Sequence, residues 1–238
     1  MYVLPLRNRP LLLSLIPALL ALAVIGSTSF ISGVESLSGQ TIVIDAGHGG
    51  IDPGGNRPGI EEKDINLAIA LELRDILCAQ GATVVMTRDR DMELSGLCDN
   101  PRVLGRYHRD LAARMEFITE SRAQFFISIH TNVAARESQR GTEVFYSGKS
   151  AAGKVLAECI HIELKKVSPP PVKAQPGNFF VLRRSPVPAV LVEVGYLTNA
   201  HDRALLAQPE HRHKLAEAIA QGVSTYNLTA PLLRALSY

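Results

Sequence analysis

The sequence predicts a three-layer α/β/α domain with a mostly parallel, six-stranded sheet, preceded by a hydrophobic leader. Apolar runs of strand length alternate along the chain with longer segments of helical periodicity, which is the pattern of α/β proteins. Two of the runs, 42–44 and 188–194, are almost continuously apolar, as expected for strands buried on both faces. Segment 62–80 carries Ile and Leu at helical spacing and is followed by Gly81, a residue typical of helix ends.

The regular elements are expected between residues 41 and 226. Strands are expected over 41–45, 82–87, 125–129, 142–147, 179–182 and 188–194. Helices are expected over 62–80, 110–122, 151–166 and 209–226. The connecting segments 46–60, 88–106 and 168–176 are rich in glycine, proline or polar residues, which predicts irregular structure.

The first thirty residues have the layout of a secretory signal. Arg7 and Arg9 precede an apolar run over 11–25, which small residues follow. The run is short for a membrane span and no Ala-x-Ala site follows it, so cleavage and anchoring through residues 10–26 both stay open. We expect export across the cytoplasmic membrane, with the chain divided into a signal or anchor (1–30), a linker (31–40), a folded domain (41–228) and a tail (229–238).

Charge and cysteine content exclude some classes of partner and site. The chain of 238 residues has a formal net charge of +2, for which Arg7 and Arg9 account. The balanced remainder has no electrostatic footprint for nucleic acid, so we expect no nucleic-acid partner. The three cysteines, Cys78, Cys98 and Cys159, include no CxxC pair, which argues against a disulfide framework and a thiolate zinc site.

Four side chains with metal-binding or acid–base chemistry lie at the ends of expected elements. His48 follows the first strand in a Gly-rich loop, and His130 follows the third. Glu193 lies near the end of the sixth strand, and Glu62 begins the helix after the first. Because ligands bind at the carboxyl ends of strands in such sheets, we expect these groups to converge. Taken alone, His48 could belong to an ordinary Gly-rich turn, and His130 could be a structural histidine. Four such groups at the same sheet edge are harder to explain without a shared function.

Two histidines and a carboxylate form a known catalytic zinc set, with a position left for water or substrate. Zinc lowers the pKa of a bound water from about 15.7 to about 7. A further group must take the proton and return it to the leaving amine. Glu193 suits this role because an acid in an apolar strand is unfavourable without a partner or a task. The sequence thus predicts one Zn²⁺ at His48, Glu62 and His130, with Glu193 catalytic.

Three further residues have a functional and a structural interpretation each. Asp45 would orient a ligand histidine or only cap its strand. Asn132 would hydrogen-bond substrate or only form a turn. Arg183, next to Arg184, would bind an acidic substrate or only be solvated.

The motifs together resemble the zinc-dependent N-acetylmuramoyl-L-alanine amidases of the amidase-3 type. The resemblance runs from about Thr41 to Tyr226 and rests on these stretches, in this order: IDAGHGGIDPGG, EKDINLAIALELRDIL, TRDRD, FFISIHTN, RGTEVFY and PAVLVEVGYLTN. It implies that 41–228 is a catalytic domain that cleaves the amide between N-acetylmuramic acid and L-Ala in peptidoglycan. The family's zinc ligands would fall on His48, Glu62 and His130, and its catalytic Glu on Glu193.

Within that family the chain most resembles the spore-cortex amidases, which have a leader and a single catalytic domain. This implies stem-peptide removal for muramic-δ-lactam formation and germination, a location outside the cytoplasm or between the spore membranes, and a regulatory lipoprotein partner. Ala46 departs from the proline common in the family, and segment 96–108 matches nothing in it. The chain carries no wall-binding repeats, so wall affinity would come from this domain, an anchor or a partner.

Two rival interpretations remain. A zinc carboxypeptidase-like peptidoglycan peptidase would use the same ligand types, but usually places His and Glu in one HxxE element, whereas His48 and Glu62 are 14 positions apart. A non-catalytic wall-binding module would be expected to have lost a ligand or Glu193, and none is missing.

Overall fold

The computed structural model describes residues 37–169 and 172–235 and confirms the α/β fold. Its main strands are β1 Thr41–Ala46, β4 Thr83–Met86, β5 Phe125–Asn132, β6 Glu143–Tyr146, β7 Gln175–Pro176 and β8 Ala189–Tyr196. They form one sheet in the order β4-β1-β5-β8-β6-β7. Only the β8–β6 pairing is antiparallel within this sheet. The expected signal or anchor over 1–30 lies outside the described residues.

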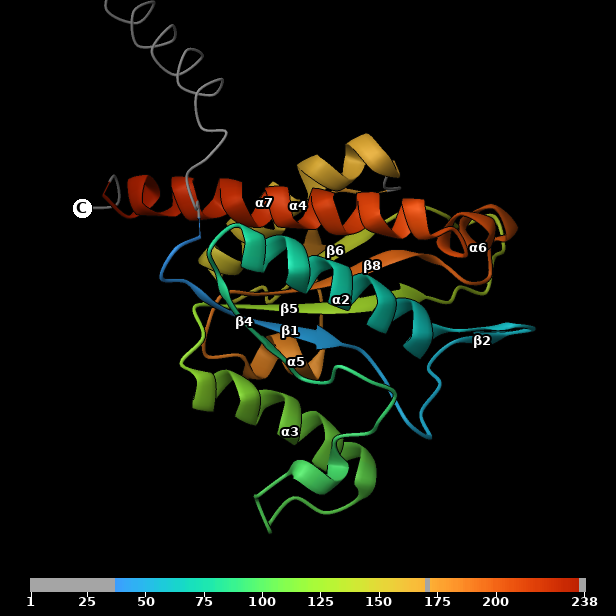
Figure 1. The fold of residues 1–238 in the computed structure, drawn as a ribbon, viewed down its shortest axis with the longest axis horizontal. Helices are drawn as coiled ribbons and strands as arrows, with labels where there is room; N and C mark the ends of the chain where they lie inside the picture. Colours follow the sequence, from blue (N-terminus) through green and yellow to red (C-terminus); the bar gives the residue numbers. More distant parts are fainter. Residues whose placement is uncertain (1–36, 170–171, 236–238) are drawn as a thin grey trace, which may run out of the picture. The chain divides into compact units, whose positions relative to one another are not determined.

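Helices cover both faces of this sheet (Figure 1). On one face lie α2 Glu62–Ala79, α4 Ala151–Val167 and α7 Pro209–Ala235. On the other lie α3 Arg106–Ser121 and the five-residue α5 Phe180–Arg184. Shorter elements are β2 Asn56–Arg57, β3 Ile60–Glu61, η1 Ser95–Leu97 and α6 Ala200–Leu206. None of the helices in these described ranges is long and apolar enough to span a bilayer.

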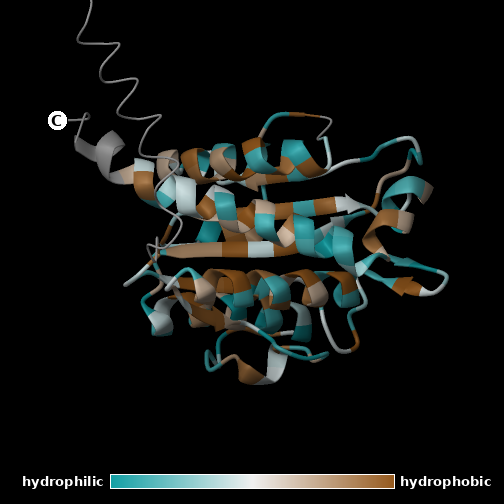
Figure 2. Ribbon diagram, turned by 45° about the horizontal axis from the view of Figure 1, so that its top comes forward, coloured by the Kyte–Doolittle hydropathy of each residue, from teal (hydrophilic) through white to brown (hydrophobic). Residues whose placement is uncertain are grey.

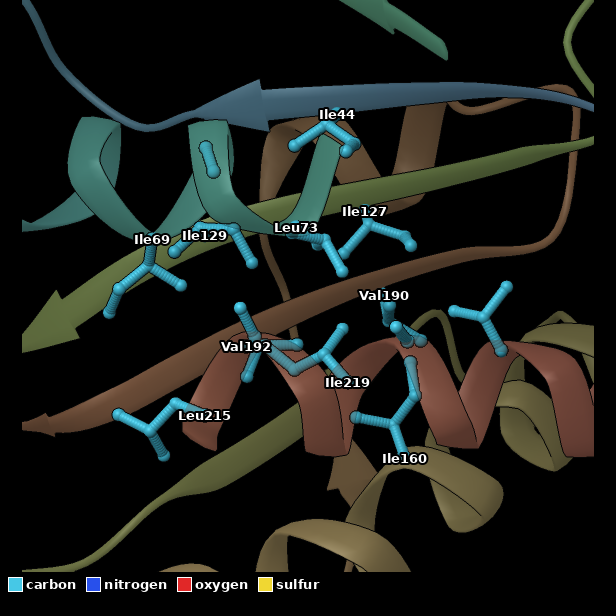
Figure 3. Close-up of a cluster of buried hydrophobic side chains, with 14 of the residues drawn as sticks. Ile44, Ile69, Leu73, Ile127, Ile129, Ile160, Val190, Val192, Leu215 and Ile219 are labelled. Carbon is cyan, nitrogen blue, oxygen red and sulfur yellow. The ribbon is translucent and has the colours of Figure 1, made fainter. Parts of the chain in front are cut away.

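The central strands are mostly apolar because both of their faces are covered. Ile42 and Ile44 of β1 are fully buried with α2, α4 and α7, while Val43 between them is fully buried with α3 and α5. Figure 3 shows Ile44, Ile127 and Val192 of three strands meeting side chains of the larger cluster. Each such burial contributes about 1.5–3 kcal/mol. Figure 2 shows the matching colours, with mostly hydrophobic strands between helices of mixed character.

Three sequence expectations about the elements were wrong. Residues 179–182 were expected to form a strand, but helix α5 begins at Phe180; a short apolar run does not distinguish the two. The sixth strand is instead β7, inside the proline-rich segment, where Pro176 is tolerated because β7 is an edge strand. Helix α7 continues to Ala235, through most of the expected tail.

The sheet order fixes where the site lies. Strands β1, β5 and β8 are parallel neighbours, so their carboxyl ends share one edge. His130 on β5 pairs in register with Glu193 on β8. The β1–α2 connection carries His48, and Glu62 is the first residue of α2.

Candidate metal centre and active site

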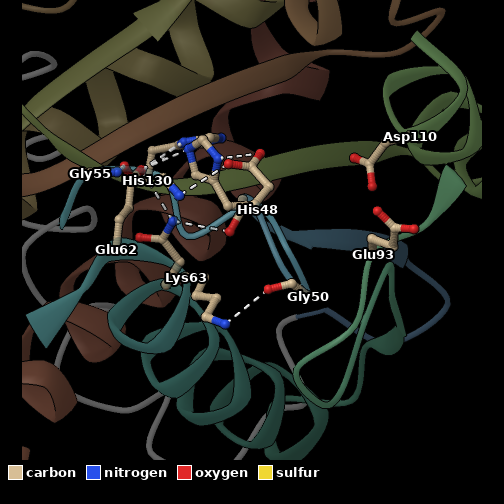
Figure 4. Close-up of polar contacts among 12 residues, drawn as sticks. His48, Gly50, Gly55, Glu62, Lys63, Glu93, Asp110 and His130 are labelled. Atoms are coloured by element: carbon tan, nitrogen blue, oxygen red, sulfur yellow. Dashed lines mark hydrogen bonds and ion pairs between the residues drawn. The ribbon is translucent and has the colours of Figure 1, made fainter. Parts of the chain in front are cut away.

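His48, Glu62 and His130 come together at this edge of the sheet (Figure 4). The Glu62 Oε1 atom lies 3.2 Å from His48 Nε2 and 3.1 Å from His130 Nδ1. One ligand atom from each residue lies within 4.8 Å of the other two, and the imidazole rings meet edge to face with centroids 5.0 Å apart. Within the described part of the chain, this is the group of metal-binding side chains that can hold one ion.

Glu62 is held by donors from three segments. Its Oε2 accepts a hydrogen bond from the Gly55 backbone N–H at 2.7 Å. Its Oε1 accepts from the Thr131 N–H at 3.0 Å and from Asn66 Nδ2 at 3.3 Å. Burial acts to raise the pKa of Glu62, but the two histidines outweigh burial and lower this pKa well below its usual value. The carboxylate is therefore ionised and fixed in place.

The electrostatics of the site favour a cation. Burial disfavours a charged His48, yet the Glu62 and Asp52 carboxylates raise the pKa of His48 to about 9. A positive charge is thus stabilised between these groups, whether it is a proton or a metal ion. Two imidazoles and a carboxylate are the donor set of catalytic zinc sites, so the residues present fit that ion.

Two glycines allow the ligands to approach the loop backbone. A Cβ atom on Gly47 would lie 2.4 Å from the His130 ring. Gly54 has φ +65°, and a Cβ atom there would lie 2.6 Å from Glu62 Oε2. His48 itself has φ 62°, a left-handed conformation that costs a non-glycine residue about 1–2 kcal/mol. The surrounding structure must therefore hold this conformation in place.

Two buried arginines behind the loop keep its backbone in this conformation. Arg88 is 2% exposed and donates from Nε to the Ala46 carbonyl at 2.9 Å and from Nη2 to the Gly47 carbonyl at 3.0 Å. Arg114 donates to the carbonyls of Ala46 and His48, each at 3.1 Å. Consecutive carbonyls of the loop are thus fixed by two guanidinium groups.

Asp45 holds Arg114 rather than a ligand histidine. Its carboxylate accepts from Arg114, Thr87 and Ser128 and is fully buried, and the described residues show no hydrogen bond from it to either histidine. The orienting role expected of Asp45 falls instead to Asp52, whose Oδ2 lies 2.8 Å from His48 Nδ1. Asp45 acts on the loop only through Arg114.

Glu193 lies beside this centre on β8. It is paired in register with His130 on one side and with Glu143 on the other, and is 7% exposed. Its Oε2 atom is buried and has no hydrogen-bond partner among the described residues. Burial, with the neighbouring Glu62 and Glu143 carboxylates, raises the pKa of Glu193 well above its usual value. A buried acid with a raised pKa is the type of group that exchanges protons near neutrality.

The other two expected residues lie farther from the ligands. Asn132, the last residue of β5, donates from Nδ2 to Glu143 Oε2 at 3.2 Å, and its Oδ1 accepts from the Val133 N–H at 2.8 Å. Arg183 is exposed on α5. Neither contacts the three ligands by a described hydrogen bond.

Sequence reasoning missed several residues that build the site: Asp52, Asn66, Arg88, Arg114 and Glu143. Asp52 had a usable signal, because it lies in the same Gly-rich loop as His48. The two arginines had none, because a buried arginine cannot be distinguished from a solvated one in a single sequence.

The fold and this geometry define a class of protein, an α/β protein with a candidate metal-binding triad at the carboxyl edge of its sheet. The chain matches the family of proteins described as N-acetylmuramoyl-L-alanine amidase (Amidase_3) over residues 42–225. It is 35% identical over 196 residues to the germination-specific N-acetylmuramoyl-L-alanine amidase of Bacillus subtilis, covering 80% of this chain and 81% of that one.

Two solved structures share the fold. The CwlD amidase from Clostridioides difficile, in complex with the GerS lipoprotein, is 36% identical with a TM-score of 0.72, and the match covers 79% of this chain and 98% of that one. The catalytic domain of CwlV, an N-acetylmuramoyl-L-alanine amidase from Bacillus (Paenibacillus) polymyxa, is 33% identical with a TM-score of 0.68, covering 79% and 97%.

The chain belongs to the N-acetylmuramoyl-L-alanine amidase family. The resemblance seen in its motifs is confirmed, and so is the class of enzyme. It is a hydrolase of the amide bond between N-acetylmuramic acid and L-Ala in peptidoglycan.

Proposed function

We propose that this amidase works with one zinc ion held by His48, Glu62 and His130. The observation that carries the proposal is the convergence of these three side chains, with Glu62 Oε1 within 3.2 Å of both imidazoles. Zinc bound there would polarise the scissile carbonyl and lower the pKa of a water. Asp52 occupies His48 Nδ1, so Nε2, which faces Glu62, is the nitrogen that would bind the ion.

Glu193 is the proton carrier in this proposal. Its carboxylate takes a proton from the attacking water, whose oxygen joins the lactyl carbonyl carbon. The C–N bond then breaks, and Glu193 returns the proton to the leaving amine of L-Ala. The unpartnered Oε2 and the raised pKa support this role, because the acid is held for proton transfer and not for structure.

The substrate and setting follow from the relatives. We infer that the chain acts on spore-cortex peptidoglycan, which its similarity to a germination-specific amidase supports. We also infer that residues 1–30 export or anchor it outside the cytoplasm, ahead of a linker and the 41–228 domain. The complex of CwlD with GerS supports a lipoprotein partner. Asn132 is proposed as a substrate contact, and Asp45 supports the loop from behind. Arg183 is exposed on α5 and is assigned no contact with the substrate.

The test is mass spectrometry of purified vegetative wall and spore cortex after digestion with the full-length chain, with added zinc or with a chelator. Free stem peptides with an N-terminal Ala, released only with zinc, are the expected products. Cuts inside the stem peptide would favour the peptidase interpretation. If zinc is bound but both walls stay intact, the chain is a binding module or needs a partner that is missing from the assay. Release of stem peptides only from vegetative wall would contradict the cortex assignment.

A further inference from the structure

Helices α3 and α5 lie on the same face of the sheet (Figure 1). Two hollows lie along the seam between them, and Phe180 lines both. The first hollow, about 130 Å³, is lined by His48 and His130 of the metal centre and by Tyr107 and Leu111 of α3. The second, about 420 Å³, is lined by residues farther along α3 and by Arg184 of α5. Phe180 lines both hollows, so the two adjoin at this side chain, and the path along the seam leads away from the metal centre.

The length of this path suits a short peptide. Tyr107 lies at the metal-centre end and Glu120 at the far end, and the thirteen helical steps between them span roughly 20 Å. An extended peptide of five residues spans about 17 Å. A stem peptide cut at its first amide must run from the metal centre in some direction, and this seam accommodates its whole length.

The chemistry of the seam also suits a peptide. Its floor is apolar, from Leu111, Met115 and Phe180, while its far end carries Arg184 and Glu120. Both of these charged residues are exposed, and neither forms an ion pair with another described residue. The Arg184 guanidinium lies 5.9 Å from the Phe180 ring centroid, a cation–π contact that holds it over the seam.

Glu116, which also lines the second hollow, already has partners within the protein. Its Oε2 accepts from the Asp99 N–H at 3.1 Å, and Oε1 contacts Cys98 Sγ at 3.7 Å. The seam therefore offers one unpaired cation and one unpaired anion. A stem peptide carries carboxylates and an amine on its side chains and terminus, so it can pair with both charges. The sugars of a glycan strand do not carry charges of both signs.

We propose that the α3–α5 seam binds the stem peptide, with Arg184 meeting a stem carboxylate beyond the first residue. The proposal rests on the amidase function above and adds the direction in which the substrate leaves the metal centre. It assigns the acidic-substrate contact to Arg184, which lines the second hollow, rather than to its neighbour Arg183, which lines neither.

The test compares two soluble muramoyl substrates, one with L-Ala alone and one with a full stem peptide. The ratio of their kcat/KM values is measured for the full-length chain, for Arg184→Gln and for Arg183→Gln. Arg184→Gln should reduce the preference for the full stem about twofold to fivefold, the range of one exposed charged contact. Arg184→Lys should restore part of it, and Arg183→Gln, matched in charge and exposure, should keep the wild-type ratio.

The outcomes separate the subsite from the activity. An unchanged ratio in Arg184→Gln, including one in which kcat/KM falls equally for both substrates, would overturn the proposal. A reduced ratio in Arg183→Gln alone would assign the contact to Arg183 and overturn it as well. If the unaltered chain releases neither L-Ala from the first substrate nor stem peptide from the second, the amidase function itself fails, and the subsite fails with it. Free stem peptide as an inhibitor gives a second reading, since its inhibition constant should rise in Arg184→Gln.

Discussion

The two sides of the metal centre differ in how completely their polar groups are satisfied. On the β1 side, the carbonyls of Ala46, Gly47 and His48 all accept hydrogen bonds from buried arginines. On the β8 side, Glu193 is buried with one oxygen that has no partner among the described residues. The first side is arranged to hold geometry, while the second keeps an acid in a state unfavourable for stability, which is typical of groups that do chemistry.

This comparison predicts that substitutions will separate by side. Changes on the β1 side should alter metal affinity first and turnover as a consequence. Changes at Glu193 should alter turnover and leave metal binding intact.

The largest effect is expected from removing a ligand. His48→Ala or His130→Ala should lose stoichiometric zinc and amidase activity together, because two donors cannot hold the ion against water and chelators. Zinc content of the purified variants and release of stem peptide measure the two losses. His213→Ala is the control, because His213 contacts Glu72 and Glu217 on the surface, away from the site. Full zinc content in either ligand variant would refute the ligand assignment.

Glu193→Gln should keep zinc but lower kcat by about 10²–10⁴-fold, the usual contribution of an acid–base group. Its apo form should be at least as stable as the unaltered protein, because an amide removes the unfavourable burial of an unpaired carboxylate. Thermal melting in chelator and zinc content give readouts that are independent of turnover. A near-wild-type rate would remove Glu193 from the mechanism.

The fold was predictable because its signals are local and repeated. The apolar runs of β1, β5 and β8 and the helical spacing of α2 each identify an element, and the parallel order then brings His48, His130 and Glu193 to one edge. The expected strand at 179–182 failed because this segment leads into the five-residue helix α5, which is too short to show a helical period.

The supporting structure was not predictable, because it depends on contacts between residues far apart in the sequence. Arg114 lies 66 positions from His48, whose carbonyl it binds, and nothing near Arg114 in the chain indicates this. Asp45 was assigned to a histidine because both lie near the same strand end. Only the packing of α3 on β1 shows that its partner is Arg114.

Arg114 provides a sharper test of the β1 side. Arg114→Lys keeps a positive charge beside Asp45 but cannot hold the carbonyls of both Ala46 and His48. Zinc affinity should fall about 10–100-fold, the usual effect of losing a group that orients a ligand, and a competition titration with a chelating dye measures it. The Co²⁺-substituted protein should show an altered absorption spectrum, which simple loss of stability would not produce.

The matched control is Arg109→Lys on the same helix. Arg109 donates to the carbonyls of Ser95, Cys98 and Asn100 and to none in the His48 loop. Its substitution should leave zinc affinity unchanged even if it loosens segment 95–103. Equal affinity in the Arg114 and Arg109 variants would show that the loop keeps its geometry without Arg114.

The smallest effect concerns pH and the pair behind the loop. Burial acts to raise the pKa of Asp45, but Arg114, Ser128 and Thr87 outweigh it and hold this pKa below its usual value of 3.8. Ionised Asp45 therefore stabilises the fold above about pH 4, and the contribution is lost as pH falls through the lowered pKa of the folded state. Urea unfolding of the unaltered protein and Asp45→Asn should differ by about 1.5–3 kcal/mol near neutrality, because the variant removes the more buried of the two carboxylates that pair with Arg114 and leaves only Asp110. The difference should narrow below pH 3.8, since protonation of Asp45 then removes the same charge in the unaltered protein. A constant difference across that range would mean that Asp45 acts by packing and neutral hydrogen bonds, and that its charge does not stabilise the β1 side.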